Sequence, residues 1–592
     1  MKLINFLFSP YGRIDRTRYS LFFLIWFLLT LFLAILSKLL FGVGEVDNIP
    51  TWYKVLFSLI EGTFFVSLFL VSAKRFHDVG VSGWFTLILL SPLILVFIKG
   101  DKKENKYGEP LVSIFANNST ISAWAKFIIV LVLYLLFLLW VKSWLGLIVV
   151  PFIYDAYISK KIRWKWWEDA ETPVRFIMSW VDALVFALVA VYFINLFFFQ
   201  NYVIPSSSLE KSLLTGDYLF VSKVSYGPRI PETPLTMPLT QHTMPLVNVK
   251  SYVEWPHWDY RRVKGLGNVK LNDIVVFNYP AGDTLVNEER YQACDYYHDL
   301  VYPFGEQILE QNGLAKDVAH LTPLQRYRYF EQVYATGRHY IESMPGEYGD
   351  IISRPTDRRE NYVKRCVGLP GQTLQIKNRI VYLNGRPNKE PDNVQYTYKM
   401  KLRGEFPVDL ADKLGITNED LLTYNQSGVI PLTRKAYLAL KANKNLVASI
   451  SINTDATYGD LYPINANTGW TRDNYGPIWI PQKGKTIALT LDNLPIYERC
   501  IKVYEGNDLK VDNAGRILIN GKVAKSYTFR LDYYWMMGDN RHNSADSRYW
   551  GFVPEDHIVG KPIFIWWSHS PDHPGFSGIR WSRLFKFVDN IK

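Results

Sequence analysis

The sequence predicts a multi-domain membrane protein. We expect an α-helical transmembrane N-terminal half, followed by a mainly antiparallel β domain with α+β insertions. Two observations predict this arrangement. Residues 1 to about 200 are dominated by Phe, Leu, Ile, Val and Trp, whereas the remainder of the 592 residues has the composition of a soluble protein. Beyond residue 200, short β-type runs are bounded by turn residues, which is typical of antiparallel sheets.

Six apolar runs in the N-terminal half are candidate membrane segments. Several are shorter than the roughly 20 residues that an untilted span needs, so interfacial Trp and Tyr must extend them. No cleavable signal peptide is expected, because no small-residue cleavage site follows the first run. The runs are about Leu21–Leu36, Val55–Val71, Trp84–Ile98, Phe127–Val141, Leu145–Ile158 and Ala183–Phe199.

Basic clusters predict the orientation of these segments, because Lys and Arg favour the cytoplasmic side of a membrane. If all the clusters are cytoplasmic, the run Trp84–Ile98 forms a re-entrant or interfacial hairpin, broken near Ser91-Pro92, and does not cross fully. Five full spans then remain, and Ser208 lies outside the cytoplasm. A sixth span would leave Ser208 inside, and we expect five. The clusters are Arg13–Arg18, Lys74–Arg75, Lys99–Lys106 and Lys160–Lys165.

The net charge of +11 does not indicate a nucleic-acid partner. Many of the basic residues flank apolar runs, where they face anionic lipid and fix the orientation of the chain. A lipid bilayer is therefore the expected partner. The three cysteines, Cys294, Cys366 and Cys500, do not have the spacing of a metal site, and no metal or cofactor is expected.

Residues 1–112 are expected to form a polytopic membrane domain. The segments Gly12–Arg16, Ala73–Trp84 and Asn105–Gly108 resemble a small bacterial inner-membrane family of unknown function. Within them, His77 and Asp78 suggest either a proton or ligand site or a polar interfacial turn. The turn is favoured, because the neighbouring spans offer no other ionisable partner.

Two further membrane elements precede the β domain. Residues 113–177 are expected to form a helical membrane hairpin that ends in the basic-aromatic stretch Lys160–Trp167, an interfacial anchor with Trp at headgroup depth. Residues 178–200 are the expected transmembrane anchor of the domain that follows.

Residues 201–592 are the expected β domain. Insertions at about 283–355 and 388–530 interrupt it, and the stretch Leu321–Phe330 of the first looks partly helical. The segments Arg379–Gly385 and Arg516–Gly521 are alike, and they are either a duplicated hairpin or two ordinary strand–turn segments ending in Asn-Gly. Expected strands include Tyr218–Lys223, Asp273–Asn278, Ile380–Leu383, Arg516–Ile519 and Pro562–Trp567.

A serine and a lysine are the candidate catalytic residues. Ser208 follows the last apolar run, but a serine hydroxyl is a weak nucleophile and needs an adjacent base. The ten histidines show no triad arrangement. Lys364 has the apolar neighbours Val363, Cys366 and Val367, and such surroundings lower the pKa of an amine until it can act as a base.

Taken singly, these residues have ordinary alternatives. Ser208 could cap a turn that begins at Leu209, Lys364 could be a solvated strand lysine, and Asp546 with Arg548 could be a surface ion pair. Their occurrence together, in order and beside a membrane span, favours a catalytic site.

In order along the chain, five segments resemble the signature boxes of bacterial type I signal peptidase, a membrane-anchored Ser–Lys endopeptidase. Any one segment alone would be unspecific, but together they are highly specific. They are Ile204–Leu209 with Leu213–Asp217, Asn272–Phe277 with Pro280, Tyr362–Gly371, and Gly538–Gly551.

The resemblance implies a role for each matching residue. Ser208 is the implied nucleophile and Lys364 the general base. Ser206 places its hydroxyl, with the backbone N–H of Ser208, in the oxyanion hole. The remaining implied roles belong to the last box: Ser544 orients the lysine by a hydrogen bond, and Asp546 and Arg548 form a supporting ion pair.

The chain departs from the family pattern at five positions. Ser207 replaces the usual Gly between the two serines, which raises the question whether its backbone can adopt the required shape, and makes Ser207 a rival nucleophile. The others are Leu209 for Met, Lys211 near a usual Pro, Gln372 for an acid, and His542 for an acid.

The resemblance implies a signal peptidase I, a serine endopeptidase that removes signal peptides through an acyl-enzyme. The implied substrates are secreted and membrane preproteins with small residues before the cleavage site, and the protein export machinery is a further possible partner. The implied location is the bacterial cytoplasmic (inner) membrane, multi-pass, with the catalytic domain on the periplasmic side. The alternatives are a non-catalytic membrane-anchored binding protein or a scaffold for exported peptides.

Overall fold

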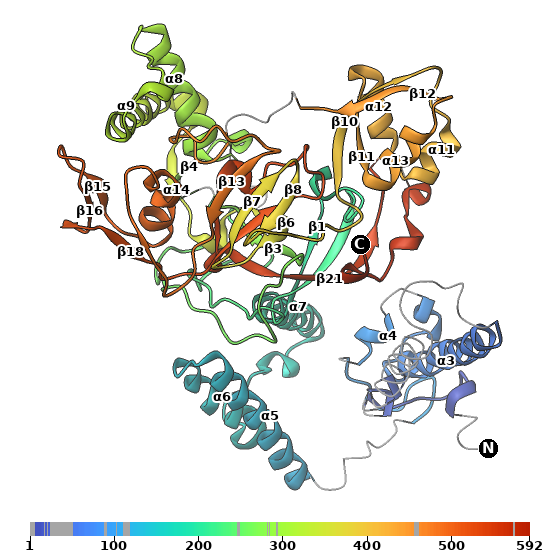
Figure 1. Ribbon diagram of the computed structural model, residues 1–592. Helices are drawn as coiled ribbons and strands as arrows, with labels where there is room; N and C mark the ends of the chain where they lie inside the picture. The colour runs from blue at the N-terminus through green and yellow to red at the C-terminus, as the bar shows by residue number, and fades with distance from the viewer. Residues whose placement is uncertain are drawn as a thin grey trace. The chain divides into compact units, whose positions relative to one another are not determined.

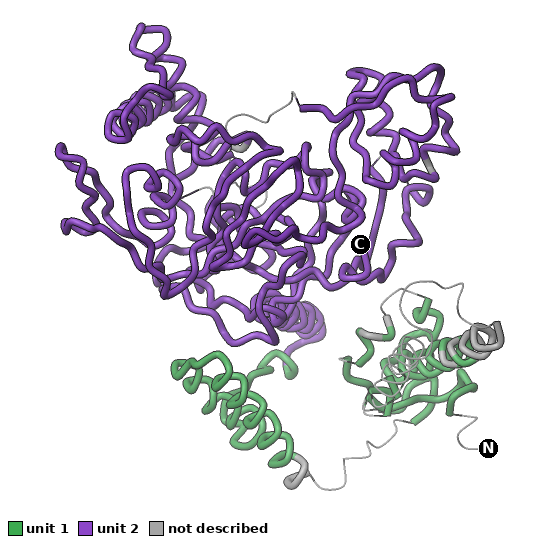
Figure 2. The backbone as a smooth tube through the Cα atoms, in the orientation of Figure 1, with its two compact units in different colours: residues 1–169 green, residues 170–592 purple. Residues whose placement is uncertain are grey.

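The computed structural model describes residues 6–591, except 17, 21, 24–25, 27–50, 88–90, 97, 102, 110–118, 245–248, 281, 283, 292–293, 455–460, 572 and 574 (Figure 1). The chain divides into two compact units, Met1–Asp169 and Ala170–Lys592 (Figure 2). The first unit is helical where it is described, and the second is built mainly of β-strands, as the composition of the two parts predicts.

In the described part of the chain, two helices are long and apolar enough to cross a membrane. They are Ala123–Val141, within α5 (Ser119–Val141), and α7 (Thr172–Phe197). The expected count of five spans therefore stays a prediction. The run Leu21–Leu36 lies almost entirely outside the described residues, and Val55–Val71 falls within α3 (Thr51–Asp78).

The other two apolar runs form short helical pieces. The described part of Trp84–Ile98 contains Gly83–Leu87 and α4 (Ser91–Ile94), and neither piece has the length of a span. Leu145–Ile158 forms consecutive segments, Leu145–Val149, α6 (Val150–Tyr154) and Asp155–Ser159. The series ends at Ser159, and the Asp155 carboxylate accepts hydrogen bonds from the backbone N–H groups of Lys161 and Ile162 just beyond that end.

A buried ion-pair cluster joins the motif segments of the first unit. Asp78, at the end of α3, accepts a hydrogen bond from Arg13 at 3.0 Å and another from Arg75. Asp78 therefore has two ionisable partners, and both lie outside the predicted apolar runs. His77 stacks on Tyr107, with ring centroids 3.9 Å apart. The three motif segments, distant in sequence, thus meet in one polar cluster.

The main sheet of the second unit has eight strands, all paired antiparallel, in the order β1-β2-β21-β3-β6-β19-β20, with β22 beside β21. This confirms the mainly antiparallel β domain. The strands are β1 (Phe199–Val203), β2 (Asp217–Ser222), β3 (Ile274–Asn278), β6 (Asn361–Gly368), β19 (Tyr533–Met537), β20 (Val553–Pro554), β21 (Ile558–Ser568) and β22 (Lys586–Phe587).

Smaller sheets flank this main sheet. The two alike segments lie in different sheets, β8–β9 in one and β16–β17 in the other, and both turn at Asn-Gly with positive φ at each residue. These are the hairpin turns that the dipeptide predicts. The strands are β7 (Thr373–Lys377), β8 (Ile380–Leu383), β9 (Arg386–Pro387), β13 (Tyr475–Trp479), β14 (Thr486–Ala488), β15 (Leu509–Val511), β16 (Ile517–Ile519), β17 (Lys522–Val523) and β18 (Ser526–Thr528).

The first insertion is a helical hairpin. It enters by β4 (Thr284–Val286), leaves by β5 (Ile351–Ser353), and contains α8 (Tyr302–Gln311), α9 (Pro323–Glu342) and α10 (Pro345–Tyr348). Gly305 and Gly337 let α8 and α9 approach closely, because a Cβ on either would come within 2.0 Å of a backbone oxygen of the other segment.

The second insertion contains an α+β unit with an apolar core of its own. Its sheet has the order β11-β10-β12, and its buried residues include Met400, Ile430 and Leu432. The remaining segment carries α14 (Leu494–Arg499). The elements of the α+β unit are β10 (Gln395–Leu402), α11 (Val408–Leu414), α12 (Asn418–Ser427), β11 (Val429–Thr433), α13 (Arg434–Ala442) and β12 (Val447–Ile452).

The largest apolar core of the second unit packs around Trp535 of β19, which is fully buried with Tyr475 and Phe552. Trp535→Ala is expected to lower the free energy of unfolding by about 3–5 kcal/mol, because it removes a large buried ring and leaves a cavity. Thermal unfolding of the detergent-solubilised chain measures this. The control Val523→Ala, at a half-exposed strand position, is expected to leave the midpoint unchanged; equal midpoints for both variants would contradict the assigned core.

Candidate active site

Ser208 lies in a tight turn directly after β1. The chain leaves this strand at Val203, and Ser206 caps a single 3-10 turn, Ser207–Leu209, in an extended conformation with φ −136° and ψ 158°. Leu209 is buried and anchors the turn in the core beneath it. Ser206 is exposed, and its side chain makes no hydrogen bond that caps the turn.

The turn geometry accounts for two departures from the family pattern. Ser207 begins a right-handed turn, where φ is negative, so no glycine is required there. Lys211 has φ +72°, a conformation that proline cannot adopt. Its ammonium pairs with Asp420 of α12 at 2.9 Å, which ties the serine turn to the second insertion.

Lys364 meets Ser208 from β6. Its Nζ donates a hydrogen bond to Ser208 Oγ at 2.7 Å, and the residue is only 4% exposed. Burial lowers the pKa of Lys364 to about 8, although the charges of Asp546 and Asp539 act in the opposite direction. The solvated-lysine alternative is therefore wrong. The structure places the Lys364 amine against the hydroxyl of Ser208, and not against that of Ser207.

Asn540 and Gly538 hold the serine turn from the last box. The Asn540 N–H donates to Ser208 O at 3.1 Å, and its side-chain amide donates to Ser207 O at 3.3 Å. A Cβ on Gly538 would lie 2.6 Å from Ser208 O and 2.3 Å from Ser544 Oγ, so only glycine fits there. The motif match assigned no role to Asn540 or Gly538.

The ion pair expected in the last box is present and buried. Arg548 binds both carboxylate oxygens of Asp546, at 2.9 and 2.8 Å, and the two side chains are almost fully inaccessible. Asp546 also accepts the Gly538 N–H at 3.1 Å and the N–H of Arg548 at the start of α15 (Ser547–Trp550). This pair is not the surface salt bridge of the ordinary alternative.

A second buried ion pair flanks the site and was missed by the sequence argument. Arg365, next to Lys364 on β6, binds both carboxylate oxygens of Asp539 at 2.7 and 2.6 Å, and Ser212 donates to the same carboxylate at 2.6 Å. The signal was available, because Arg365 and Asp539 both lie inside matched boxes.

Ser544 lies beside the serine turn, but without the expected bond to the lysine. Its Oγ is buried and has no hydrogen-bond partner within the described residues. Both this Oγ and the Ser208 carbonyl oxygen lie close to Gly538. The amine of Lys364 is directed at Ser208 instead. The expectation that Ser544 orients Lys364 by a hydrogen bond is therefore wrong.

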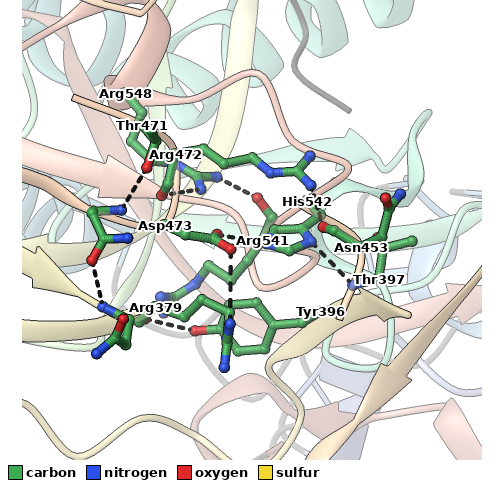
Figure 3. A network of polar contacts seen from close by, with 12 residues as sticks. Arg379, Tyr396, Thr397, Asn453, Thr471, Arg472, Asp473, Arg541, His542 and Arg548 are labelled. Carbon is green, nitrogen blue, oxygen red and sulfur yellow. Dashed lines mark hydrogen bonds and ion pairs between the residues drawn. The ribbon is translucent and has the colours of Figure 1, made fainter. Parts of the chain in front are cut away.

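Gln372 and His542, which stand where the family has acids, each have polar partners. Gln372 Oε1 accepts the Leu369 N–H at 2.8 Å and closes the turn after β6. His542 is buried, which lowers its pKa. Its Nδ1 accepts the Thr397 N–H at 3.3 Å, so Nε2 carries the proton and donates to Asp473 at 2.8 Å (Figure 3). A neutral histidine thus links the last box to the second insertion.

The arrangement can perform nucleophilic catalysis by a serine with an amine as base. A base must lie within about 2.6–3.2 Å of the hydroxyl that it deprotonates, and the contact between Lys364 and Ser208 meets that requirement. A buried amine with a pKa of about 8 is partly neutral near pH 7 and can accept a proton. In the described residues, no group of three His, Cys, Asp or Glu side chains could hold a metal ion.

Comparison with known proteins assigns the N-terminal and C-terminal parts of the chain to two different families, as the sequence analysis expects. Residues 7–109 match a family described as proteins of unknown function, DUF805. Residues 177–297, 322–445 and 483–567 match the family described as signal peptidase, peptidase S26, and together they cover more than half of the chain. The expected N-terminal and C-terminal resemblances are both confirmed.

Individual relatives are similar over part of their length. Signal peptidase I of Buchnera aphidicola subsp. Acyrthosiphon pisum is 26% identical over 264 residues, which are 44% of this chain and 67% of the relative. Signal peptidase I of Buchnera aphidicola subsp. Schizaphis graminum is 25% identical over 42% of this chain and 63% of its own. That of Haemophilus influenzae is 49% identical over 56 residues, 9% of this chain and 16% of its own.

The chain thus spans about two thirds or less of the length of these curated relatives. The matched family covers β1, β6 and β19, which carry or adjoin Ser208, Lys364 and the last box. Its enzyme class, serine endopeptidase, is the one expected from the sequence. The chain belongs to the signal peptidase family, peptidase S26.

Proposed function

We propose that this protein is a signal peptidase I, which cleaves N-terminal signal peptides from exported preproteins by a Ser–Lys dyad and an acyl-enzyme. The observation that supports this most directly is the 2.7 Å contact between Lys364 Nζ and Ser208 Oγ. Burial adds to it, because an amine with a pKa of about 8 can act as a base where an exposed lysine cannot.

The proposed reaction has two halves. Neutral Lys364 accepts the Ser208 proton as Oγ attacks the carbonyl carbon before the scissile bond. The Ser206 hydroxyl and the Ser208 N–H stabilise the resulting oxyanion. The C–N bond then breaks, the leaving amine takes the proton from the Lys364 ammonium, and the signal peptide stays as an ester on Ser208. Lys364 next deprotonates a water molecule, which hydrolyses the ester and regenerates the serine.

Membrane attachment is part of the proposal. The apolar helix α7 ends at Phe197, and β1 begins two residues later, so the site lies a short length of chain from a candidate span. We assign the protein to the bacterial inner membrane, multi-pass, with the site on the periplasmic side. The proposed substrates are secreted and membrane preproteins with small residues before the cleavage site.

The alternative of a non-catalytic binding protein has less support. Ser207 motivated that alternative, yet a serine fits the 3-10 turn at this position without strain. A binding protein also has no need to bury an amine against a serine hydroxyl, because burial of a charged group costs free energy.

Replacing the proposed dyad residues is expected to abolish cleavage. Ser208→Ala and Lys364→Ala in detergent-purified full-length enzyme should each lower kcat on a preprotein at least about 10³-fold, because the two groups act as one unit. Ser207→Ala is the matched control and should retain most activity, since Lys364 contacts Ser208 rather than Ser207. Activity remaining in Ser208→Ala and lost in Ser207→Ala would reverse the assignment.

Cleavage is expected to rise with pH across the pKa of Lys364. Burial lowers that pKa to about 8, and only the neutral amine accepts the serine proton, so kcat/KM should increase between about pH 7 and 9 and then level off. The pH profile of preprotein cleavage by the wild type measures this. A profile that is flat over the same range would contradict the role of Lys364 as the base.

Filling the space at Gly538 is expected to displace the serine. In Gly538→Ala the new methyl group meets Ser208 O and Ser544 Oγ, and a shift of about 1 Å in a reacting group lowers kcat about 10²-fold. Gly404→Ala is the control, because a Cβ there meets no atom within 4 Å. Steady-state kinetics separates the two variants, and undiminished kcat in Gly538→Ala would show that the serine turn is not held at this point.

A further inference from the structure

A cavity of about 460 Å³ lies at the end of the candidate span α7, within the second unit. Tyr192 and Asn195 of α7 line it, together with Asn201 of β1 and residues 236–241 of a later loop. The volume suits a ligand of headgroup size, because small-molecule pockets hold roughly 300–1,000 Å³. The proposed chemistry at Ser208 gives this cavity no role.

Two hydrogen bonds fix the cavity at the level where α7 ends. Lys223, the residue after β2, donates its backbone N–H at 2.8 Å to the carbonyl of Phe198, which caps α7. The Tyr192 hydroxyl donates to Pro234 O at 3.0 Å and ties the loop to the last turns of the helix. With α7 as a membrane span, this level is the headgroup layer, where Tyr is enriched.

Positive charge predominates in the lining of the cavity. Its charged residues are Lys223, Arg229, Asp357 and Arg358. The Asp357 carboxylate lies 3.7 Å from the Arg358 guanidinium, so these two charges balance each other. Arg229 donates to Asn278 Oδ1 at 2.6 Å and to the carbonyl of Asp556, which are both neutral oxygens. Among the described lining residues, Lys223 and Arg229 thus have no balancing carboxylate.

The side chain of Lys223 provides the second observation. Its ammonium has neither a hydrogen bond nor an ion pair within the part of the chain that the structure describes. Burial lowers the pKa of Lys223 to about 7, and the charges of Arg229 and Arg358 act in the same direction. An ammonium in such surroundings costs free energy, and a bound anion recovers it, because an opposite charge favours the charged form.

Exposed apolar side chains at the opening of the cavity favour a lipid over a free anion. Met237 and Leu239 line the cavity, yet 46% and 70% of their surfaces remain exposed. Val189 and Phe193 of α7 are also exposed. Exposed apolar surface beside basic groups, at the end of a span, suits an acyl chain and the phosphate that it carries.

We propose that this cavity binds the phosphate of an anionic phospholipid in the leaflet next to the β domain. The Lys223 ammonium donates to a phosphate oxygen, the charge of Arg229 adds to the attraction, and the acyl chains leave past Met237 and Leu239. Charge-assisted hydrogen bonds to phosphate are stronger than neutral ones. The inference uses the proposed span α7 but not the peptidase reaction.

A lipid titration tests the proposal on the full-length protein, purified in a neutral detergent. The probes are dihexanoylphosphatidylglycerol, dihexanoylphosphatidylcholine and inorganic phosphate, and native mass spectrometry counts the bound molecules. The wild type is expected to bind the anionic lipid about tenfold more tightly than the zwitterionic one, whose cation opposes Lys223. Inorganic phosphate lacks acyl chains, so at least about tenfold more of it should be needed to displace the lipid.

Lys223→Gln is expected to weaken binding of the anionic lipid about tenfold, because it removes the unpaired ammonium. Lys250→Gln is the matched control. This exposed lysine of the neighbouring loop pairs with Glu254 and does not line the cavity, so its loss should leave the affinity within about twofold of the wild type. Thermal unfolding of both variants checks that they are folded.

Leu239→Asp keeps the test valid should Lys223→Gln not fold. It places a carboxylate at the opening of the cavity, at an exposed position, and should weaken binding of the anionic lipid by a similar factor. Leu266→Asp is its control, because Leu266 is 85% exposed and does not line the cavity.

The outcomes separate this proposal from the proposed function. Equal binding of the two lipids by the wild type, or an undiminished affinity in folded Lys223→Gln and Leu239→Asp, overturns the lipid site. Displacement of the lipid by an equal concentration of inorganic phosphate assigns the cavity to a free anion and overturns it too. A wild type that binds the lipid as expected but cleaves no preprotein overturns the peptidase proposal and leaves the lipid site standing.

Discussion

The site depends on one constraint, the burial of the Lys364 amine against the hydroxyl of Ser208. Burial disfavours the ammonium, whereas the nearby carboxylates Asp546 and Asp539 favour it. Each carboxylate is held by its own arginine, Arg548 or Arg365, so much of its negative charge is neutralised locally. Burial consequently outweighs the two acids, and the pKa of Lys364 stays near 8 rather than at the ordinary value of an exposed lysine.

The antiparallel sheet makes this burial possible. β6 lies between β3 and β19, so Lys364 projects from an interior strand, with Val275 as its partner across the ladder. The serine reaches it from a different direction, on a turn that the backbone of Asn540 fixes at its carbonyl. Two elements thus bring the groups into contact, and the absence of a side chain at Gly538 leaves room for the Ser208 carbonyl and the Ser544 hydroxyl.

The sequence allowed the strands and the contacting pair to be predicted, because short β-type runs and ordered motifs are local signals. It did not predict Asn540 as the support of the serine turn, nor the absence of a bond from Ser544, because both depend on how distant segments pack. Lys211 shows the same limit. Its left-handed conformation and its pairing with Asp420, 209 residues away, explain why proline is absent, yet neither can be read from neighbouring residues.

The second insertion is better understood as part of the site's support than as an appended module. Arg548 binds Asp546 beside the dyad and also donates to Arg472 O in the second insertion. His542, in the same box as Arg548, holds β10 of the insertion, because its Nδ1 accepts the Thr397 N–H (Figure 3). A displacement of the insertion would therefore reach Asp546 through buried hydrogen bonds, and Asp546 acts on the charge of Lys364. The second insertion thus helps to set the electrostatics of the dyad.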